Sequence, residues 1–287
     1  DLDFEKLRVR YFHGYLESDS SFINRYVTGR GIEWNNNNNL LIGLSEIVIY
    51  SGINRPIDFS YLNPITTHLE VELNDRQNSQ GTDSGNGVWQ ISLDYLFKSN
   101  LRLSINYLFD EFTLDNEQKE KGKGSARAYS FKAVYFPSKN EESYVKYHFS
   151  TISVGTNTFR HQEGNNNFVQ RNGPLGWQAG NDTREIKMGF NWLYKKMIIT
   201  DLDIGLKSLG EKNFIESLYE PYTDYFEEPF PSGEVENISF IFSKVQYWWR
   251  PYLSTHIKLE YNNSNKLGKN FEWNIGFDIY YGLNKYL

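Results

Sequence analysis

The chain has 287 residues, of which 17% are aromatic, and it contains no cysteine, so a disulfide scaffold and a thiolate metal site are excluded. Its formal net charge is −6, and beyond the short stretch from Lys119 to Lys123 its basic residues form no blocks of the kind typical of nucleic-acid-binding proteins. No apolar run approaches the ~20 residues that a membrane-spanning helix requires.

Alternation of apolar and polar residues recurs along the chain. Successive side chains of a β-strand point to opposite faces, so this pattern predicts strands with one apolar face. Each predicted strand is long enough to cross a bilayer at a tilt. Together with the turn signals between them, the pattern predicts about thirteen strands, at residues 4–16, 25–34, 40–51, 66–74, 87–97, 101–111, 127–136, 143–154, 184–194, 197–207, 238–249, 253–262 and 271–283, and residues 52–65 can contain a further element.

The last strand shows the pattern most clearly, because every odd position from Phe271 to Tyr281 carries a large apolar side chain. A soluble sheet can use this pattern too. In a membrane barrel the other face lines a polar interior, so a polar average composition agrees with strands that span a bilayer. We therefore predict an all-β fold, an antiparallel transmembrane β-barrel of the outer-membrane type, as a single domain over residues 1–287.

Loop lengths carry a second signal. Short turns near 98–100, 138–142, 195–196 and 250–252 alternate with long loops at 112–126, 155–183 and 208–237. Outer-membrane barrels place short turns in the periplasm and long loops outside, which predicts a periplasmic C-terminus.

The strand count creates a difficulty at the other end of the chain. Counting back from a periplasmic C-terminus makes the run Asn35 to Asn39 an extracellular turn and makes the first strand begin outside the cell. Bacterial barrels normally have an even strand number and begin in the periplasm. Either a strand is expected upstream, within a larger barrel near 18 strands, or one of the thirteen is wrong.

Two charged residues conflict with their strand faces. A charge that faces lipid is costly, so Gly29 and Gly31 predict a bulge that turns Arg30 inward, and a kink or an inward apolar plug is expected at Glu46. An Arg30–Glu46 ion pair across the lumen and contact with a ligand both remain open. The apolar residues that share these faces are Tyr26, Ile32 and Trp34 for the arginine and Ile42, Leu44 and Val48 for the glutamate.

Aromatic residues near strand ends are predicted to form an interfacial girdle, with sugar stacking as the alternative. They include Trp34, Trp89, Trp192, Trp248, Trp249, Trp273 and Tyr280. Stacking is favoured for Trp177, Tyr219, Tyr222 and Tyr225, since these lie in predicted outside loops, where binding residues usually occur. The loop from Leu218 to Glu236 is predicted to be an ordered surface feature.

Little in the sequence indicates catalysis, a metal or a cofactor. Asp201 and Asp203 share a face, but nothing fixes a calcium ligand set. His148 and Ser150 form a same-face pair of a kind that arises by chance in a polar lumen, so no enzyme is expected. Charges of both signs are predicted to line the lumen, which suits paired networks and sugar hydroxyls better than passage of one ion sign. These are Arg8, Arg10, Arg102, Lys132, Lys146, Glu185, Lys187, Asp201, Lys258, Glu260 and Asp278.

Several stretches resemble the Wzi-type capsule-assembly outer-membrane proteins, particularly their relatives in Bacteroidetes-like lineages. They are Arg25 to Trp34, Leu40 to Tyr50 with its Gly43-Leu44-Ser45-Glu46 core, Asp58 to Pro64, Gly173 to Gly176 and Gly180 to Glu185. The resemblance covers most of this chain but only the C-terminal part of a typical family member. Family members often have a His beside the Arg of the second motif, where this chain has Gly29-Arg30-Gly31.

The resemblance implies an 18-stranded barrel that attaches capsular or other surface polysaccharide as a lectin. Only Arg25, Arg30, Glu33 and Glu46 carry over as motif positions, with roles unassigned. Extracellular polysaccharide and outer-membrane lipid are the expected partners of a monomeric barrel that needs no cofactor and binds no nucleic acid. A general porin or uptake channel is the alternative, followed by a docking subunit for a secretion or lipoprotein partner.

Overall fold

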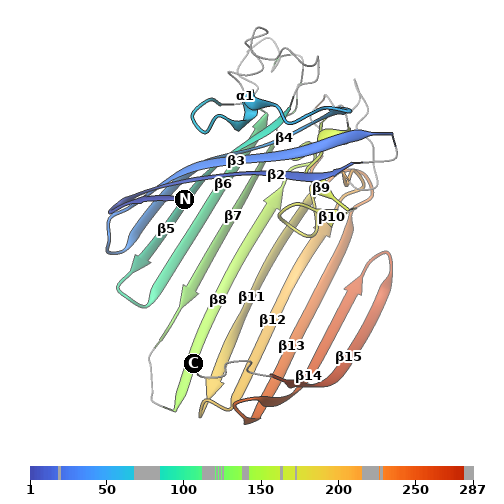
Figure 1. Ribbon diagram of the computed structural model, residues 1–287. Coiled ribbons are helices and arrows are strands. Elements are labelled where there is room, and N and C mark those ends of the chain that lie inside the picture. The colour runs from blue at the N-terminus through green and yellow to red at the C-terminus, as the bar shows by residue number, and fades with distance from the viewer. Residues whose placement is uncertain are drawn as a thin grey trace.

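The protein folds into a 13-stranded antiparallel sheet in which neighbours in space are neighbours in sequence (Figure 1). The computed structural model describes residues 1–18, 21–67, 85–111, 126–137, 142–161, 164–171, 173–214 and 229–280, and residues 120, 122, 124 and 226. The strands of the sheet are β1 Leu2–Phe4, β2 Leu7–Ser18, β3 Ile23–Asn35, β4 Leu40–Ile53, β5 Asn86–Phe97, β6 Leu101–Glu111, β7 Ala126–Tyr135, β8 Ser143–Val154, β11 Thr183–Tyr194, β12 Ile198–Leu209, β13 Glu236–Arg250, β14 Leu253–Ser264 and β15 Gly268–Ile279.

Within the described ranges, few other elements accompany this sheet. They are the short helix α1 (Phe59–Leu62), the 3₁₀ turn η1 (Gly164–Asn166) and the small ribbon of β9 (Val169–Gln170) and β10 (Gly173–Pro174). No helix in the described ranges is long and apolar enough to span a membrane.

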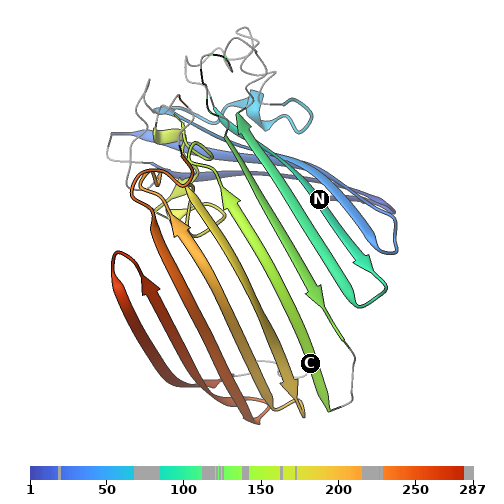
Figure 2. The same ribbon diagram turned by 180° about the vertical axis from the view of Figure 1, so that it is seen from behind.

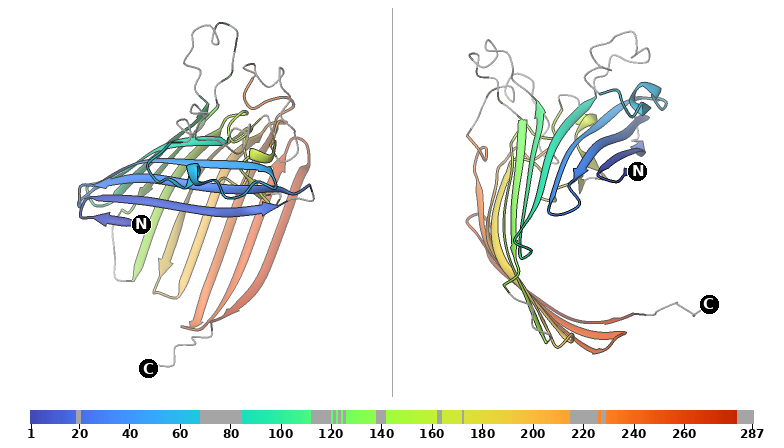
Figure 3. Two further views of the ribbon diagram at one scale, coloured as in Figure 1. Left: turned by 45° about the horizontal axis from the view of Figure 1, so that its top comes forward. Right: turned by 90° about the vertical axis from the view of Figure 1, so that its left-hand side faces the viewer.

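The sheet curves strongly, so it has a convex and a concave face (Figures 2 and 3). Among the described residues β1 pairs only with β2 and β15 only with β14, which leaves the sheet open between these edges. The connection between β8 and β11 carries η1 and lies within the curve, whereas α1 lies on the convex side (Figure 3).

The convex face is apolar and the concave face is polar, as the alternation predicted. On β12, for example, Ile204 and Leu206 are exposed on the convex face, whereas Asp203 and Lys207 point to the concave face. The concave charges form ion pairs between strands, which confirms the predicted mixed-charge network. The pairs include Arg10–Glu33 at 3.0 Å, Arg102–Asp94 at 2.9 Å, Lys207–Glu185 at 3.2 Å and His148–Asp203 at 2.6 Å.

Twelve of the thirteen predicted strands are present, and the strand predicted at 66–74 does not lie between β4 and β5, where its position in the sequence would put it. β4 pairs directly with β5, with Ile49 opposite Asn86, so no strand lies between them. Residues 54–67 instead contain α1, the further element expected near 52–65, and residues 68–74 lie outside the described ranges. The three-residue β1 brings the sheet to 13 strands.

Removing that strand reverses the ends assigned to everything before it. The turn after β3 lies beside the end of β5, where the Leu96 N–H donates to the Asn39 carbonyl at 2.8 Å. The Asn35 to Asn39 run therefore belongs with the short turns, and the predicted extracellular position is wrong. β2 likewise begins at the short-turn end, with Leu7 opposite Trp34.

The asparagine run makes this turn through its side chains. The Asn36 Oδ1 accepts the backbone N–H groups of Asn38, Asn39 and Leu40 at 2.9–3.0 Å. Asn37 adopts a φ of 58°, which asparagine tolerates better than most residues. A run that reads as low-complexity sequence is thus a self-capped hairpin turn.

A charge on the convex face is expected to destabilise the protein far more than the same charge on the concave face. Ile204→Arg places a guanidinium among lipid-facing side chains and should cost about 2–4 kcal/mol if the position lies near the bilayer centre. Ser150→Arg on the concave face is the matched control and should cost much less. Urea unfolding of both variants in lipid vesicles measures the difference, and equal losses would contradict the assignment of the faces.

Candidate functional site

A cavity of about 370 Å³ lies on the concave face of β2 to β5. Small residues form much of its surface, which leaves space between the strands. Its concave-face side chains include Arg10, Phe12, Glu33, Ser45, Gln90 and Ser92, together with Gly29, Gly31 and Gly43. We call this cavity the luminal groove.

The glycines determine the shape of the luminal groove. A Cβ at Gly29 would collide with the ring of Phe12, so the missing side chain allows that ring to lie against β3. A Cβ at Gly43 would similarly meet the Ser92 hydroxyl. Phe12 remains 50% exposed, so an aromatic ring is available to a ligand within an otherwise polar lining.

Polar groups surround this ring. The Arg10 guanidinium and the Glu33 carboxylate pair at 3.0 Å, and both remain partly exposed. The Gln90 amide donates to Asn106 at 2.9 Å. The luminal groove therefore offers a balanced ion pair, an amide and serine hydroxyls around one exposed aromatic face.

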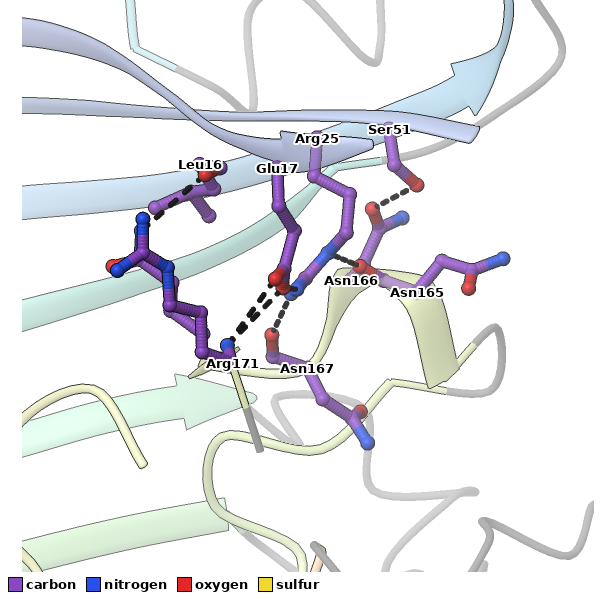
Figure 4. A network of polar contacts seen from close by, with 9 residues as sticks. Leu16, Glu17, Arg25, Ser51, Asn165, Asn166, Asn167 and Arg171 are labelled. Atoms are coloured by element: carbon purple, nitrogen blue, oxygen red, sulfur yellow. Dashed lines mark hydrogen bonds and ion pairs between the residues drawn. The ribbon is translucent and has the colours of Figure 1, made fainter. Parts of the chain in front are cut away.

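A polar network holds the in-folded loop between β8 and β11 against the long-loop ends of β2, β3 and β4 (Figure 4). Arg25 donates to the carbonyls of Asn165 and Asn167 at 2.6 and 2.7 Å and pairs with Glu17 at 2.6 Å. The Ser51 hydroxyl donates to the Asn166 side chain at 2.7 Å. Arg25 and Ser51 thus tie the strands β3 and β4 to a loop more than 100 residues later in the chain.

A bulge on β2 makes this arrangement possible. Tyr15 lies opposite Tyr26 and Glu17 lies opposite Arg25, so Leu16 is the extra residue. It allows Leu16 to pack with the apolar cluster under the loop while Glu17 still reaches Arg25. The cluster is formed by Ile49, Val88 and Phe168 with Leu16, Val27, Ile47, Leu108, Phe159 and Leu175 around it. Since Ile47 also lines the luminal groove, the groove adjoins the apolar cluster under the loop at this end.

The predicted Arg30–Glu46 ion pair is confirmed, but its predicted position is not. The side chains pair at 2.8 Å and are 9% and 1% exposed. The register between β3 and β4 is regular from Ile23 to Asn35, so the bulge at Gly29 and Gly31 and the kink at Glu46 are both wrong. The pair joins neighbouring strands on the convex face, where residues 54–67 cover it.

The other predicted site residues fall in different places. Glu33 lines the luminal groove and Arg25 anchors the loop between β8 and β11. Trp177 is half-buried in that loop, and its carbonyl accepts the Gly180 N–H at 2.9 Å. Tyr219, Tyr222 and Tyr225, like most of the 218–236 loop, lie outside the described ranges.

The sequence pattern missed Phe12, although a signal was present. Phe12 is an aromatic residue at a polar-face position of β2, and it lies opposite a glycine. An exception of this kind to the alternation marks an aromatic ring that faces the lumen.

His148 contacts Asp203 at 2.6 Å on the concave face, where Gly189 on the strand between them leaves room. Within the described ranges, no group of three His, Asp or Glu side chains converges in a way that could hold a metal ion.

The sequence matches no protein-family model and no curated protein. Among solved structures, the chain is similar to Wzi, an outer-membrane protein of group 1 capsule assembly in Escherichia coli that is described as a carbohydrate-binding β-barrel. The TM-score is 0.63 at 12% identity, over 94% of this chain and 54% of that one. The chain therefore spans about half the length of that protein.

Two further outer-membrane structures are similar at lower scores. A bacterial polysaccharide outer membrane secretin gives a TM-score of 0.42 at 10% identity, over 96% of this chain and 72% of that one. The CymD monoaromatic hydrocarbon channel gives 0.35 at 10% identity, over 98% and 81%. These scores are too low to bear on function, and 12% identity to Wzi shows the fold without establishing the family. The protein has the fold of an outer-membrane β-barrel, and this fold places it in the bacterial outer membrane.

Proposed function

We propose that this protein binds an extracellular or capsular polysaccharide in the luminal groove, as part of a Wzi-type capsule-assembly barrel. The observation that carries the proposal is the exposed ring of Phe12 among the polar groups of Arg10, Glu33 and Gln90. A pyranose ring has an apolar C–H face and a rim of hydroxyls. An aromatic face attracts the former, and charged and amide groups hydrogen-bond the latter.

The surroundings of the luminal groove support the same proposal. Arg10 and Glu33 neutralise each other, so the pair offers donors and acceptors to hydroxyls without net charge. The fold similarity to a carbohydrate-binding barrel agrees with it as well. Binding without turnover is part of the proposal, and His148 and Ser150 have no role in it.

Phe12→Ala is expected to weaken binding of the polysaccharide about tenfold, which corresponds to ~1.4 kcal/mol. The stacking surface is lost while the polar groups stay. Calorimetric titration with fragments of the producing cell's own surface polysaccharide measures the change. Phe242→Ala, which removes a phenylalanine from the concave face of β13, is the matched control and should leave binding unchanged.

Gly29→Ala tests whether Phe12 acts by stacking on the sugar rather than by stabilising the fold. The added methyl group displaces the Phe12 ring, and this side chain can move aside. Binding of the polysaccharide should therefore weaken, whereas the free energy of unfolding should change by less than about 1 kcal/mol. Binding that survives both Phe12→Ala and Gly29→Ala would exclude the luminal groove as the polysaccharide site.

A porin or uptake channel is the second candidate. A second cavity of about 560 Å³ extends the polar concave lining toward the short-turn end, beside Asp94, Arg102, Lys132 and Lys146. Planar-bilayer recordings distinguish the two functions. Steady large conductance without any polysaccharide binding would favour the channel and exclude anchoring.

A further inference from the structure

We infer that residues 54–67, which contain α1, form a lipid-facing flap that takes the place of the outer surface of β2 to β4 in the membrane. Its occupant is the acyl-chain region of the outer-membrane lipid. Because the flap lies at the long-loop end, which faces the cell exterior in outer-membrane barrels, the lipid is that of the outer leaflet.

The strand surface beneath the flap is unsuited to lipid. Arg30, Glu46 and Thr28 lie on the convex face there and are almost fully buried. Glu46 is opposite Trp89 on β5, which is in turn opposite Phe109 on β6. The charged pair is therefore level with apolar side chains of the neighbouring strands, where a bare charge would meet hydrocarbon.

Hydrogen bonds and a ring contact attach the flap to all three strands. The Tyr11 hydroxyl on β2 donates to the Leu62 carbonyl at 2.8 Å, and Arg30 on β3 donates to the Asn63 carbonyl at 2.8 Å. On β4, the ring of Tyr50 stacks on the ring of Tyr61 with centroids 4.4 Å apart.

An irregular segment tolerates lipid only if its backbone groups are satisfied. In addition to the two carbonyls above, the Arg55 carbonyl accepts from Asn24 and Tyr26 at 2.9 and 3.0 Å. The backbone N–H of Ser60 donates to the Asp58 side chain at 2.9 Å, which caps α1. At these positions the backbone groups of the flap are therefore hydrogen-bonded, as contact with hydrocarbon requires.

The flap also presents the wrong polarity for a water-facing loop. Its charged residues Arg55 and Asp58 are 4% and 8% exposed and pair with each other at 3.0 Å. Tyr61 is buried against β4, but three large apolar residues of the flap point outward, with Phe59 83%, Ile65 86% and Ile57 48% exposed. Charges inward and apolar side chains outward is the arrangement of a surface that contacts lipid, and it continues the apolar convex face of the sheet.

The absence of cysteine allows a clean test, because a single introduced cysteine carries the only label. Phe59→Cys and Ile65→Cys are labelled with a nitroxide in the full chain reconstituted into lipid vesicles. Collision with oxygen, which concentrates in lipid, is compared with collision with a water-soluble nickel complex. Ile204→Cys on the convex face and Ser150→Cys on the concave face serve as references for lipid and water.

Both flap labels are expected to collide with oxygen more than with nickel, as the label at Ile204 does. Nickel access equal to that at Ser150 would place the flap in water, and low access to both reagents would place it against protein; either result overturns the inference. Each labelled variant must first retain the heat-modifiable migration of a folded barrel. A variant that fails this check is replaced by Ile57→Cys, whose parent side chain is 48% exposed on the same flap.

Discussion

Replacing Glu46 with alanine is expected to destabilise the folded barrel by about 3–5 kcal/mol, because it leaves the Arg30 guanidinium buried without its counter-charge. The Glu46 side chain is 1% exposed and lies 2.8 Å from Arg30 beneath the flap. Among the residues that the structure describes, few charged side chains have so little exposure. The urea midpoint of the protein in lipid vesicles measures the loss.

Two further variants test the cause of this loss. Glu260→Ala removes a carboxylate from the concave face of β14 and should change stability by less than about 1 kcal/mol. The double variant Arg30→Ala/Glu46→Ala should be less destabilised than the sum of the single variants, since the residues contact each other. Equal losses for Glu46→Ala and Glu260→Ala would mean that the pair is not buried.

Replacing Asp182 with alanine is expected to cost about 3–4 kcal/mol and to loosen the loops at the long-loop end. This carboxylate is fully buried and accepts the Ser232 N–H at 2.9 Å, the Lys212 N–H at 3.1 Å and the Thr156 hydroxyl at 2.8 Å. It therefore joins the loop after β8 to the loop after β12. Thermal unfolding and limited proteolysis report the two effects.

Glu234→Ala is the matched control, because it removes an exposed carboxylate from the loop before β13. It should leave both the melting temperature and the cleavage pattern unchanged. Asp182→Asn tolerates the left-handed backbone of φ 54° but turns an amide N–H toward N–H donors, so it should fall between the other two. Unchanged loop cleavage in Asp182→Ala would show that other contacts hold these loops.

The Gly180 to Glu185 stretch that contributed to the family resemblance thus has a structural role. Asn181 acts beside Asp182, accepting the Phe214 N–H at 2.7 Å and donating to the Lys212 carbonyl at 2.9 Å. The Arg25 to Trp34, Leu40 to Tyr50 and Asp58 to Pro64 stretches likewise form one unit, β3, β4 and the flap. The residues of these stretches organise the wall of the barrel, and Glu33 and Gly31 also contribute to the luminal groove.

The sequence by itself determined the strands and the faces they present. Alternation depends only on the geometry of an extended chain, in which residues two apart share a face. Apolar rows such as Phe271 to Ile279 can therefore be recognised without knowing which strands lie beside them. Loop lengths after β5 were readable for the same local reason. The prediction failed between β4 and β5, which pair directly although the pattern of residues 66–74 predicted a strand between them.

The tertiary structure alone decided how Arg30 and Glu46 are accommodated and where the luminal groove lies. From the alternation alone, each strand residue faces either lipid or the lumen. A charged residue on the apolar face was therefore predicted to turn inward through a bulge. Residues 54–67 and the loop between β8 and β11 supply covering layers on the convex and the concave face through contacts with strands distant in sequence. Such contacts depend on which segments meet in space, and no local period of the chain encodes them.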